Sequence, residues 1–303
     1  MIVVRFTGGL GNQMFQYALG RHLALIHKRH LRFDVSGYVD DKPDAKTGVR
    51  LFGLSSFRVE GEIASRDDLE VFQPHRAVGL GGRVVRAIDR CKPLAQRRVI
   101  QERMDDRWQF RPELLNSHLA DPVCVVGLWH TEKYFASIAS TIRSELQVKS
   151  AATNENAAML AEIASTDSVA VHVRHGDNVT VEKAHGALPV SYYQQASQRL
   201  QQCVSNPRYY VFSDDPTWAK ANLAFLGEAV FVSHNGDEKN HEDLRLMSAC
   251  KHHIVGNSTF SWWGAWLGEK EGQLVYAPRQ YHVAATYTYP DYYPANWTLL
   301  PAI

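Results

Sequence analysis

The hydrophobic pattern at the start of the chain predicts a strand, a glycine turn, a helix and a second strand. Apolar residues run from Ile2 to Phe6, three glycines fall within residues 8–11, and apolar side chains recur at the helical period from Phe15 to Ile26. Residues 31–35 then alternate between apolar and polar, as in a half-buried strand. This β–glycine loop–α–β order is typical of doubly wound and dinucleotide-binding domains.

The second half of the chain repeats the alternation of strands and helices. We expect strands at residues 169–174, 209–212, 230–233, 254–256 and 274–277, with helices between them. Strands separated by helices form parallel sheets, which place ligand sites at the carboxyl ends of their strands. Residues 39–107 are less regular and are interpreted as loops and short helices. Residues 281–303 are rich in Tyr and Pro and are interpreted as a tail that crosses a surface rather than as a core element.

A chain of 303 residues is expected to form two domains, with one large α/β domain as the alternative. Residues 148–156 are small and polar with weak periodicity, which indicates a linker. We therefore divide the chain into domains 1–150 and 151–303. The second domain includes the tail, which can pack back on the first.

Charge and composition exclude several classes of protein. Lys and Arg total 33 against 32 Asp and Glu, which gives a formal net charge of +1 and no basic excess for a nucleic-acid partner. No apolar stretch of 18 residues is present, so no integral membrane segment is expected, and the first residues do not resemble a signal peptide. Four widely spaced cysteines indicate reduced thiols. A cytoplasmic protein is expected, with peripheral association at the inner face of the membrane left open.

The first candidate site is the segment GGLGNQ, residues 8–13, between the first strand and the first helix. Gly9 and Gly11 would let the backbone approach a ligand closely. Asn12 and Gln13 carry carboxamides that suit sugar hydroxyls as well as helix capping. The segment is not a complete G-x-G-x-x-G motif, because a methionine replaces the last glycine. A tight turn without a ligand is therefore an alternative.

The second candidate site is the segment VHVRHGD, residues 171–177, at the end of a predicted strand. The valines share one face of that strand, so His172 and Arg174 share the other. Arg174 suits a bidentate clamp on a diphosphate leaving group, because its charge is permanent. Asp177 could orient either side chain. A structural Arg–Asp pair is the alternative, and His175 is interpreted as a loop histidine.

Two aspartates follow the strand expected at residues 209–212. Asp215 precedes Pro216, which predicts a helix N-cap with proline at the first helical position. Asp214 is then free to accept N–H bonds from the edge of a guanine base. Metal binding by the two aspartates is the alternative, although no further carboxylate or histidine lies beside them in the sequence.

A hydroxyl-rich turn at residues 257–261, NSTFS, opens a predicted helix after the strand expected at 254–256. Helix-terminal N–H groups and hydroxyls form anion sites, and a pyrophosphate would fit there. The tryptophans that follow are interpreted as helix core, with a platform for a sugar ring as the alternative.

Four further features have weaker signals. Asp34 lies at about the distance of a ribose-binding acid from the glycine turn, and His185 lies in the loop after the Arg174 segment. His252 and His253 are interpreted as residues that precede a buried strand. The basic stretch from Arg83 to Arg98 is interpreted as a solvated helix face.

Taken in order, these segments resemble glycosyltransferase family 11, the bacterial GDP-L-fucose-dependent α-1,2-fucosyltransferases. The opening GGLGNQMFQYA, the central HVRHGD, the segment FSDDPTW and the stretch DLRLMSACKHHIVGNSTFSWWGAWL occur in the order and spacing of that family. The resemblance spans nearly the whole chain. One residue departs from the pattern, because the family usually has H-x-R-R-G-D and His175 stands where the second arginine is expected.

The resemblance implies an α/β fold of two Rossmann-like domains, of the GT-B type, with the active site in the cleft between an acceptor-binding first domain and a donor-binding second domain. Arg174 would grip the β-phosphate, and Asn12 would reach the reacting centre. The expected catalytic residues are Arg174, Asp177 and Asn12; the donor-binding residues are His172, Asp214, Asp215, Asn257, Ser258, Thr259, Ser261, Gly9 and Gly11; and the acceptor-binding residues are Gln13, Asp34 and His185.

The implied reaction is an inverting transfer of L-fucose from GDP-β-L-fucose to the 2-OH of a terminal β-galactoside, in an O-antigen or another surface glycan. The acceptor would be an oligosaccharide or a lipid-linked glycan, and no metal or other cofactor is expected. Asp177, Asp34 and His185 all stay open as the catalytic base. The alternatives are a fucosyltransferase of another linkage, a transferase of another GDP-sugar, or a non-catalytic nucleotide-sugar-binding protein.

Overall fold

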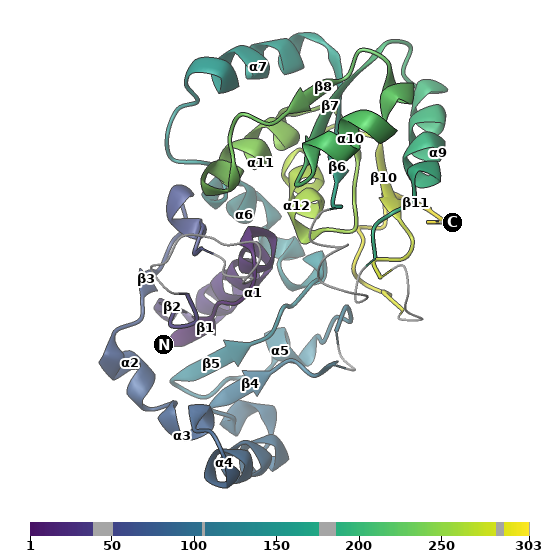
Figure 1. Ribbon diagram of the computed structural model, residues 1–303. Helices are drawn as coiled ribbons and strands as arrows, with labels where there is room; N and C mark the ends of the chain where they lie inside the picture. The colour runs from purple at the N-terminus through teal and green to yellow at the C-terminus, as the bar shows by residue number, and fades with distance from the viewer. Residues whose placement is uncertain (39–50, 105–106, 176–185, 283–287, 303) are drawn as a thin grey trace. The chain divides into compact units, whose positions relative to one another are not determined.

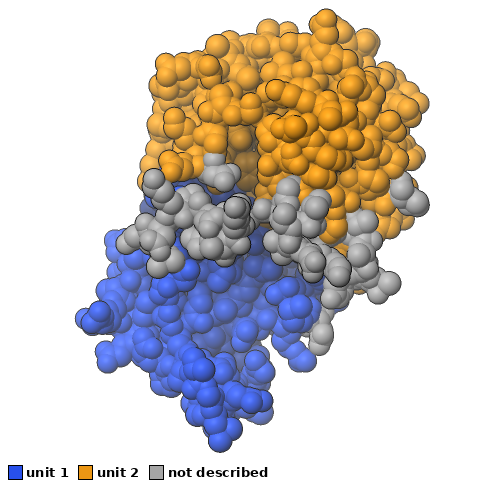
Figure 2. Space-filling model, in the orientation of Figure 1, with its two compact units in different colours: residues 1–146, 290–293 blue, residues 147–289, 294–303 orange. Residues whose placement is uncertain are grey.

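The computed structural model describes residues 1–38, 51–104, 107–175, 186–282 and 288–302. The chain divides into two compact units, which Figure 2 shows in different colours. The first consists of residues 1–146 and 290–293, and the second of residues 147–289 and 294–303.

The first unit is built on a parallel sheet of five strands (Figure 1). The strands are β1 (Ile2–Arg5), β2 (Leu31–Asp34), β3 (Glu62–Ile63), β4 (Val99–Gln101) and β5 (Val123–Val126). Their order across the sheet is β3-β2-β1-β5-β4, and all neighbours are parallel. The strand order reverses between β1 and β5. In open parallel sheets, ligands bind outside the carboxyl ends of the strands at such a switch point.

Helix α1 (Leu10–His27) follows the glycine turn, in which Gly8 has a φ of +79°. The other helices of this unit are α2 (Arg66–Glu70), α3 (Gln73–Arg76), α4 (Leu80–Cys91), α5 (Glu113–Asn116) and α6 (Ala139–Glu145). The interpretation of residues 39–107 as loops and short helices was incomplete, because it missed β3 and β4. The helix expected around Arg83 is present as α4, although it ends at Cys91 and not at Arg98. Strands of two or three residues are too short to show an alternating pattern.

The second unit is built on a parallel sheet of six strands. The strands are β6 (Asp167–Val173), β7 (Pro207–Ser213), β8 (Val230–Val232), β9 (His252–Ile254), β10 (Val275–Pro278) and β11 (Thr298–Leu300). The helices are α7 (Asn154–Ser165), α9 (Val190–Gln201), α10 (Pro216–Asn222), α11 (Asn240–Ala249) and α12 (Thr259–Leu267). The order β8-β7-β6-β9-β10-β11 is the doubly wound 3-2-1-4-5-6 order, with its switch point between β6 and β9.

The topology confirms the predicted fold class, an α/β protein with two Rossmann-like sheets. The interpretation of the tryptophans as helix core is also confirmed, because Trp262 and Trp263 on α12 are fully buried. Two predictions were wrong. Residues 281–303 were expected to form no core element, but they contribute β11, which pairs with β10. His252 and His253 were expected to precede a strand, but both lie within β9. His253 is buried and bonds to the carbonyl of Met247.

Residues 290–293 belong to the first unit although the chain on both sides of them belongs to the second. The Asp291 carboxylate accepts the backbone N–H of Phe110 at 2.7 Å and pairs with Lys133. The ring of Tyr292 is fully buried, with its centroid 6.0 Å from that of His130. This short segment is thus an integral part of the first unit.

No helix in the described residues is long and apolar enough to cross a membrane. The four cysteines are free thiols, of which Cys124 and Cys250 are buried.

Close packing of α1 on β1 yields a stability prediction. A Cβ at Gly20 would overlap Cγ2 of Val4, which is fully buried. We expect Gly20→Ala to lower the free energy of unfolding by about 1–3 kcal/mol, as overpacked cores do. In a urea denaturation double-mutant cycle, Val4→Ala should recover much of this loss by removing the overlapping methyl group.

Gly81→Ala on α4 is the matched control, because nothing lies within 4 Å of a Cβ at that exposed position. It should raise stability by about 0.5–1 kcal/mol through helix propensity. The packing argument fails if the two alanine variants are equally stable.

Candidate functional site

The carboxyl ends of three strands in the second unit bring together Arg174 and the predicted donor-site residues other than Gly9 and Gly11. Val173 on β6 is in register with Ser213 on β7, and Val171 is in register with Ile254 on β9. Arg174 therefore leaves β6 beside Asp214, which leaves β7. The turn before α12 follows β9 on the other side, so the cluster lies at the switch point of the sheet.

The Asp214 carboxylate joins the β6 and β7 ends. One of its oxygens lies 3.3 Å from Nη1 of Arg174, and the other accepts the backbone N–H of His175 at 2.9 Å. The Arg174 side chain remains 27% exposed, so its guanidinium can still meet a ligand. Asp214 is thus a partner of Arg174, whereas Asp177 lies outside the described residues.

Asp215 has the capping role that its neighbour Pro216 predicts. Its carboxylate accepts the backbone N–H of Trp218 at 3.0 Å at the start of α10, and its second oxygen lies 3.0 Å from Nδ1 of His175. The Trp218 N–H and then His175 hold the pKa of this carboxyl below its usual range. The His175 ring also stacks on the Trp218 ring, with 4.2 Å between the two ring centroids. In place of the family's second arginine, this chain therefore has an imidazole held against α10.

His172 is a buried histidine with an unsatisfied ring nitrogen. Its side chain is 5% exposed, and Nδ1 has no hydrogen-bond partner among the described residues. Burial, and then the positive charge of Arg174, lower the pKa of His172 to about 4, against the opposing effect of Asp214. The imidazole is therefore neutral at neutral pH. An unsatisfied buried nitrogen is costly, and a bound ligand is one way to satisfy it.

The hydroxyl-rich turn before α12 is stabilised by its own side chains. Ser258 caps the helix by accepting the N–H of Phe260 at 3.3 Å. The fully buried Ser261 hydroxyl lies 3.1 Å from the carbonyl of Ser258 and 3.3 Å from that of Gly256. The Asn257 amide donates to the carbonyls of Gly186 and Tyr281. These groups shape the turn, and their contact with a pyrophosphate stays a prediction.

Tyr281 is a site residue that sequence reasoning missed. It is 8% exposed, and burial raises the pKa of its hydroxyl to about 12, while Arg174 and the backbone N–H of Thr259 act in the opposite direction. Its hydroxyl thus lies at the start of α12, within the electrostatic influence of Arg174. Its position soon after a predicted strand was the only available signal, and it was assigned to the surface tail.

The switch point of the first unit holds a second polar pair. Oδ1 of Asn12, after β1, lies 3.1 Å from Nε2 of His130, after β5. His130 is 5% exposed, and its ring centroid lies 5.0 Å from that of Phe15. Sequence reasoning missed His130, although a histidine four residues beyond a buried strand belongs to the same sheet edge. Of the two predicted glycines, Gly9 precedes α1 and has open space around its Cα, whereas Gly11 is buried within the helix.

Gln13 and Asp34 are fully buried and engaged. The Gln13 amide donates to the carbonyls of Gly8 and Leu51 and accepts the N–H of Gly53, which fixes the glycine turn. The contact of Gln13 and Asp34 with an acceptor stays a prediction.

The Asp34 carboxylate accepts from Arg5 at 3.0 Å and from the Ser36 hydroxyl at 2.7 Å, with Arg76 at 3.5 Å. Burial alone would raise its pKa, but these partners together hold it below the usual range. A buried carboxylate with a lowered pKa is a weak proton acceptor. The third candidate base, His185, lies outside the described residues. Within the described ranges, no group of three or more His, Cys, Asp or Glu side chains could hold a metal ion.

Comparison with known proteins decides the family. The sequence model of Glycosyl transferase family 11 matches residues 114–300, which contain β5 to β11 and the whole cluster around Arg174. The chain belongs to glycosyltransferase family 11. The family that the motifs resembled is therefore confirmed, and the protein is a glycosyltransferase.

Three relatives with known names are similar to this family 11 chain over all or part of its length. An α-1,2-colitosyltransferase of Escherichia coli is 30% identical over 306 residues, which cover 98% of each chain. The O-antigen biosynthesis glycosyltransferase WbnK of Escherichia coli is 29% identical over 91% of this chain and 93% of that protein. The galactoside α-(1,2)-fucosyltransferase 2 of Mus musculus is 32% identical over 127 residues, 41% of this chain and 34% of that protein.

The lowered pKa of His172 yields a prediction of pH-dependent stability. As pH falls below about 6.5, the unfolded chain binds a proton at His172 that the folded protein binds only near pH 4, so folding becomes less favourable across this window. We expect His172→Phe to flatten the dependence of the free energy of unfolding on pH by up to about 1.4 kcal/mol per pH unit. Urea denaturation at several pH values measures both slopes.

Phe260→Leu is the control, because Phe260 lies against the His172 ring, at 5.8 Å between centroids, and does not titrate. It should lower stability without changing the slope. A His172→Phe variant whose slope equals that of the wild type would contradict the assignment of a neutral imidazole.

Proposed function

We propose that this family 11 enzyme transfers L-fucose from GDP-β-L-fucose to the 2-OH of a terminal β-galactoside, with inversion at the anomeric carbon. The observation that supports it best is the cluster at the β6 end. There, the Arg174 guanidinium, positioned by Asp214, lies next to a neutral, buried His172 whose Nδ1 has no partner in the part of the chain that the structure describes. A cationic clamp beside an unsatisfied ring nitrogen suits a nucleoside diphosphate, which carries a charged group and a hydrogen-bonding base.

On this proposal Arg174 binds the diphosphate and stabilises the negative charge that develops as GDP leaves. The first backbone N–H groups of α12 add a second source of positive potential. Interactions that strengthen as the bond to GDP breaks accelerate the reaction, because they favour the transition state over the bound substrate. The exposed part of Arg174 supports this role.

His172 would bind the guanosine part of the donor, together with Asp214. Each carboxylate oxygen has two lone pairs, so Asp214 can accept from a base while it holds Arg174 and the His175 N–H. Asp215 is less suited to this, because it caps α10 and contacts His175. We propose that His175, stacked on Trp218, replaces the second arginine by positioning Asp215 and α10 and not by adding a charge to the diphosphate.

Asn12 would contact the reacting sugar from the switch point of the first unit, with His130 fixing its amide. Asp34 is the least suited of the candidate bases, since it is buried, ion-paired and of lowered pKa. The proposed reaction needs no divalent metal, because Arg174 and backbone N–H groups take the role of a Lewis acid. The O-antigen relative supports a surface glycan as acceptor and thus synthesis in the cytoplasm.

Replacing Arg174 tests the proposal. Arg174→Ala should lower kcat for fucosyl transfer by about 10²–10³, the usual cost of losing one preorganised donor to a developing charge. Arg174→Lys should recover part of the loss, because it keeps the charge but not the bidentate geometry. Rates are measured by GDP release with lactose, lacto-N-biose, N-acetyllactosamine and Galβ1-3GalNAc, with product linkage determined by NMR and with EDTA present.

Arg208→Ala is the matched control, because Arg208 lies at the amino end of β7, bonded to Glu162, and should keep the wild-type rate. Full activity of Arg174→Ala, or an activity that EDTA abolishes and a divalent cation restores, would contradict the corresponding part of the proposal.

A second candidate donor is GDP-L-colitose, because an α-1,2-colitosyltransferase matches 98% of the chain. Colitose is fucose without the 3-hydroxyl. A site that hydrogen-bonds a hydroxyl rejects the deoxy analogue by about 10⁴–10⁵ in kcat/KM, whereas an apolar pocket discriminates weakly. We expect the wild-type enzyme to prefer GDP-L-fucose in a direct competition of the two donors. The reverse preference would establish colitosyl transfer and leave the roles of Arg174 and His172 intact.

A further inference from the structure

Helix α4 turns an apolar stripe toward solvent. Leu80, Val84 and Ile88 are spaced four residues apart and so share one face of the helix, and they are 77%, 47% and 56% exposed. Val78, just before the helix, is 99% exposed. Apolar residues on a surface helix normally face the core. Here no described residue covers them.

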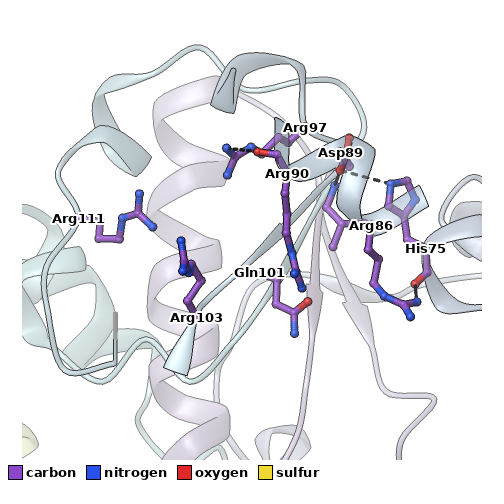
Figure 3. Close-up of a pocket in the computed structure, with 9 residues that line it drawn as sticks. His75, Arg86, Asp89, Arg90, Arg97, Gln101, Arg103 and Arg111 are labelled. Carbon is purple, nitrogen blue, oxygen red and sulfur yellow. Dashed lines mark hydrogen bonds and ion pairs between the residues drawn. The ribbon is translucent and has the colours of Figure 1, made fainter. Parts of the chain in front are cut away.

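Arginines lie on the flank of the same helix and around a neighbouring pocket. The pocket measures about 330 Å³, lies between α4 and β4, and is lined by Arg86, Arg90, Arg97, Arg103 and Arg111 together with His75 and Asp89 (Figure 3). Residues 75–111 contain ten Lys and Arg but only four Asp and Glu, in a chain whose formal net charge is +1. The basic excess that the whole chain lacks is thus concentrated here.

The orientation of α4 is fixed from its other side. Asp89 is 3% exposed and accepts the backbone N–H of Val99 on β4 at 3.0 Å and the ammonium group of Lys92 at 3.1 Å. Arg86 donates to the carbonyl of His75 at 2.7 Å. With its polar side attached to the sheet, the helix cannot turn Leu80 and Ile88 inward. Their exposure is therefore a stable feature of the surface.

We propose that the apolar stripe of α4, with the positive charge of the arginines around it, forms a docking surface for an anionic phospholipid membrane. An amphipathic helix with arginines beside its apolar face binds in the plane of the lipid interface, with its apolar side chains in the acyl boundary and its charges on the headgroups. In this arrangement the stripe enters the acyl boundary, and the positive charge of the surrounding arginines attracts the lipid headgroups. Nucleic acid fits less well, because it offers no partner for an aliphatic stripe.

Co-sedimentation of the full chain with vesicles tests the proposal. We expect binding to phosphatidylcholine vesicles that contain about one third phosphatidylglycerol, weaker binding as salt is raised, and little binding to pure phosphatidylcholine. The triple variant Leu80→Ser, Val84→Ser, Ile88→Ser and the double variant Arg90→Glu, Arg103→Glu should each lower the partition coefficient at least about tenfold.

Two controls match these variants. Phe225→Ser removes an exposed apolar side chain from the second unit, and Arg66→Glu reverses an exposed charge on α2. Both should bind vesicles as the wild type does. Thermal unfolding of every variant checks that it is folded. Because the assay contains neither donor nor acceptor, its outcome is independent of the proposed function.

Equal binding by all variants, absence of binding to the anionic vesicles, or equal binding to both kinds of vesicle would overturn the proposal. Light scattering tests whether a second copy of this chain binds the stripe instead of a membrane. A wild-type dimer that the triple serine variant dissociates, without vesicle binding, would assign the stripe to an interface between copies of this chain.

Discussion

The carboxylate of Asp214 is the constraint on which the second unit's site depends. It fixes the Arg174 guanidinium at the end of β6 and the backbone of His175 beside it. The charge held there is in turn one cause of the lowered pKa of His172. One carboxylate between two strand ends therefore sets the position of the cation and of the His175 backbone, whereas burial is the main cause of the neutral state of His172.

Both units place their polar groups by the same topological rule. In each sheet the chain builds strands outward from one starting strand, returns, and builds on the other side. The helices that follow the two central strands diverge at this point, which leaves space for polar groups beyond the strand ends. Asn12 and His130 meet there in the first unit, and Arg174 and the turn at Ser258 lie there in the second.

Sequence reasoning succeeded where the signal is local and failed where a contact spans the chain. Asp215 followed by Pro216 specifies an N-cap within two residues, and the structure has it. By contrast, Gln13 is fixed by the carbonyl of Leu51, and the carbonyl of Tyr281 accepts the amide of Asn257, 24 residues earlier. Such partners are set by tertiary packing. Short edge strands such as β3 and β11 pair through the backbone, so their side chains show little pattern.

The placement of residues 290–293 in the first unit has a consequence for the order of folding during synthesis. The polypeptide passes between the units three times, and the first unit receives its last residues only after residues 147–289 have been made. Until then, the Phe110 N–H lacks the Asp291 carboxylate, and His130 lacks the ring of Tyr292. The amino-terminal unit, synthesised first, is thus completed last, together with the edge strand β11 of its partner.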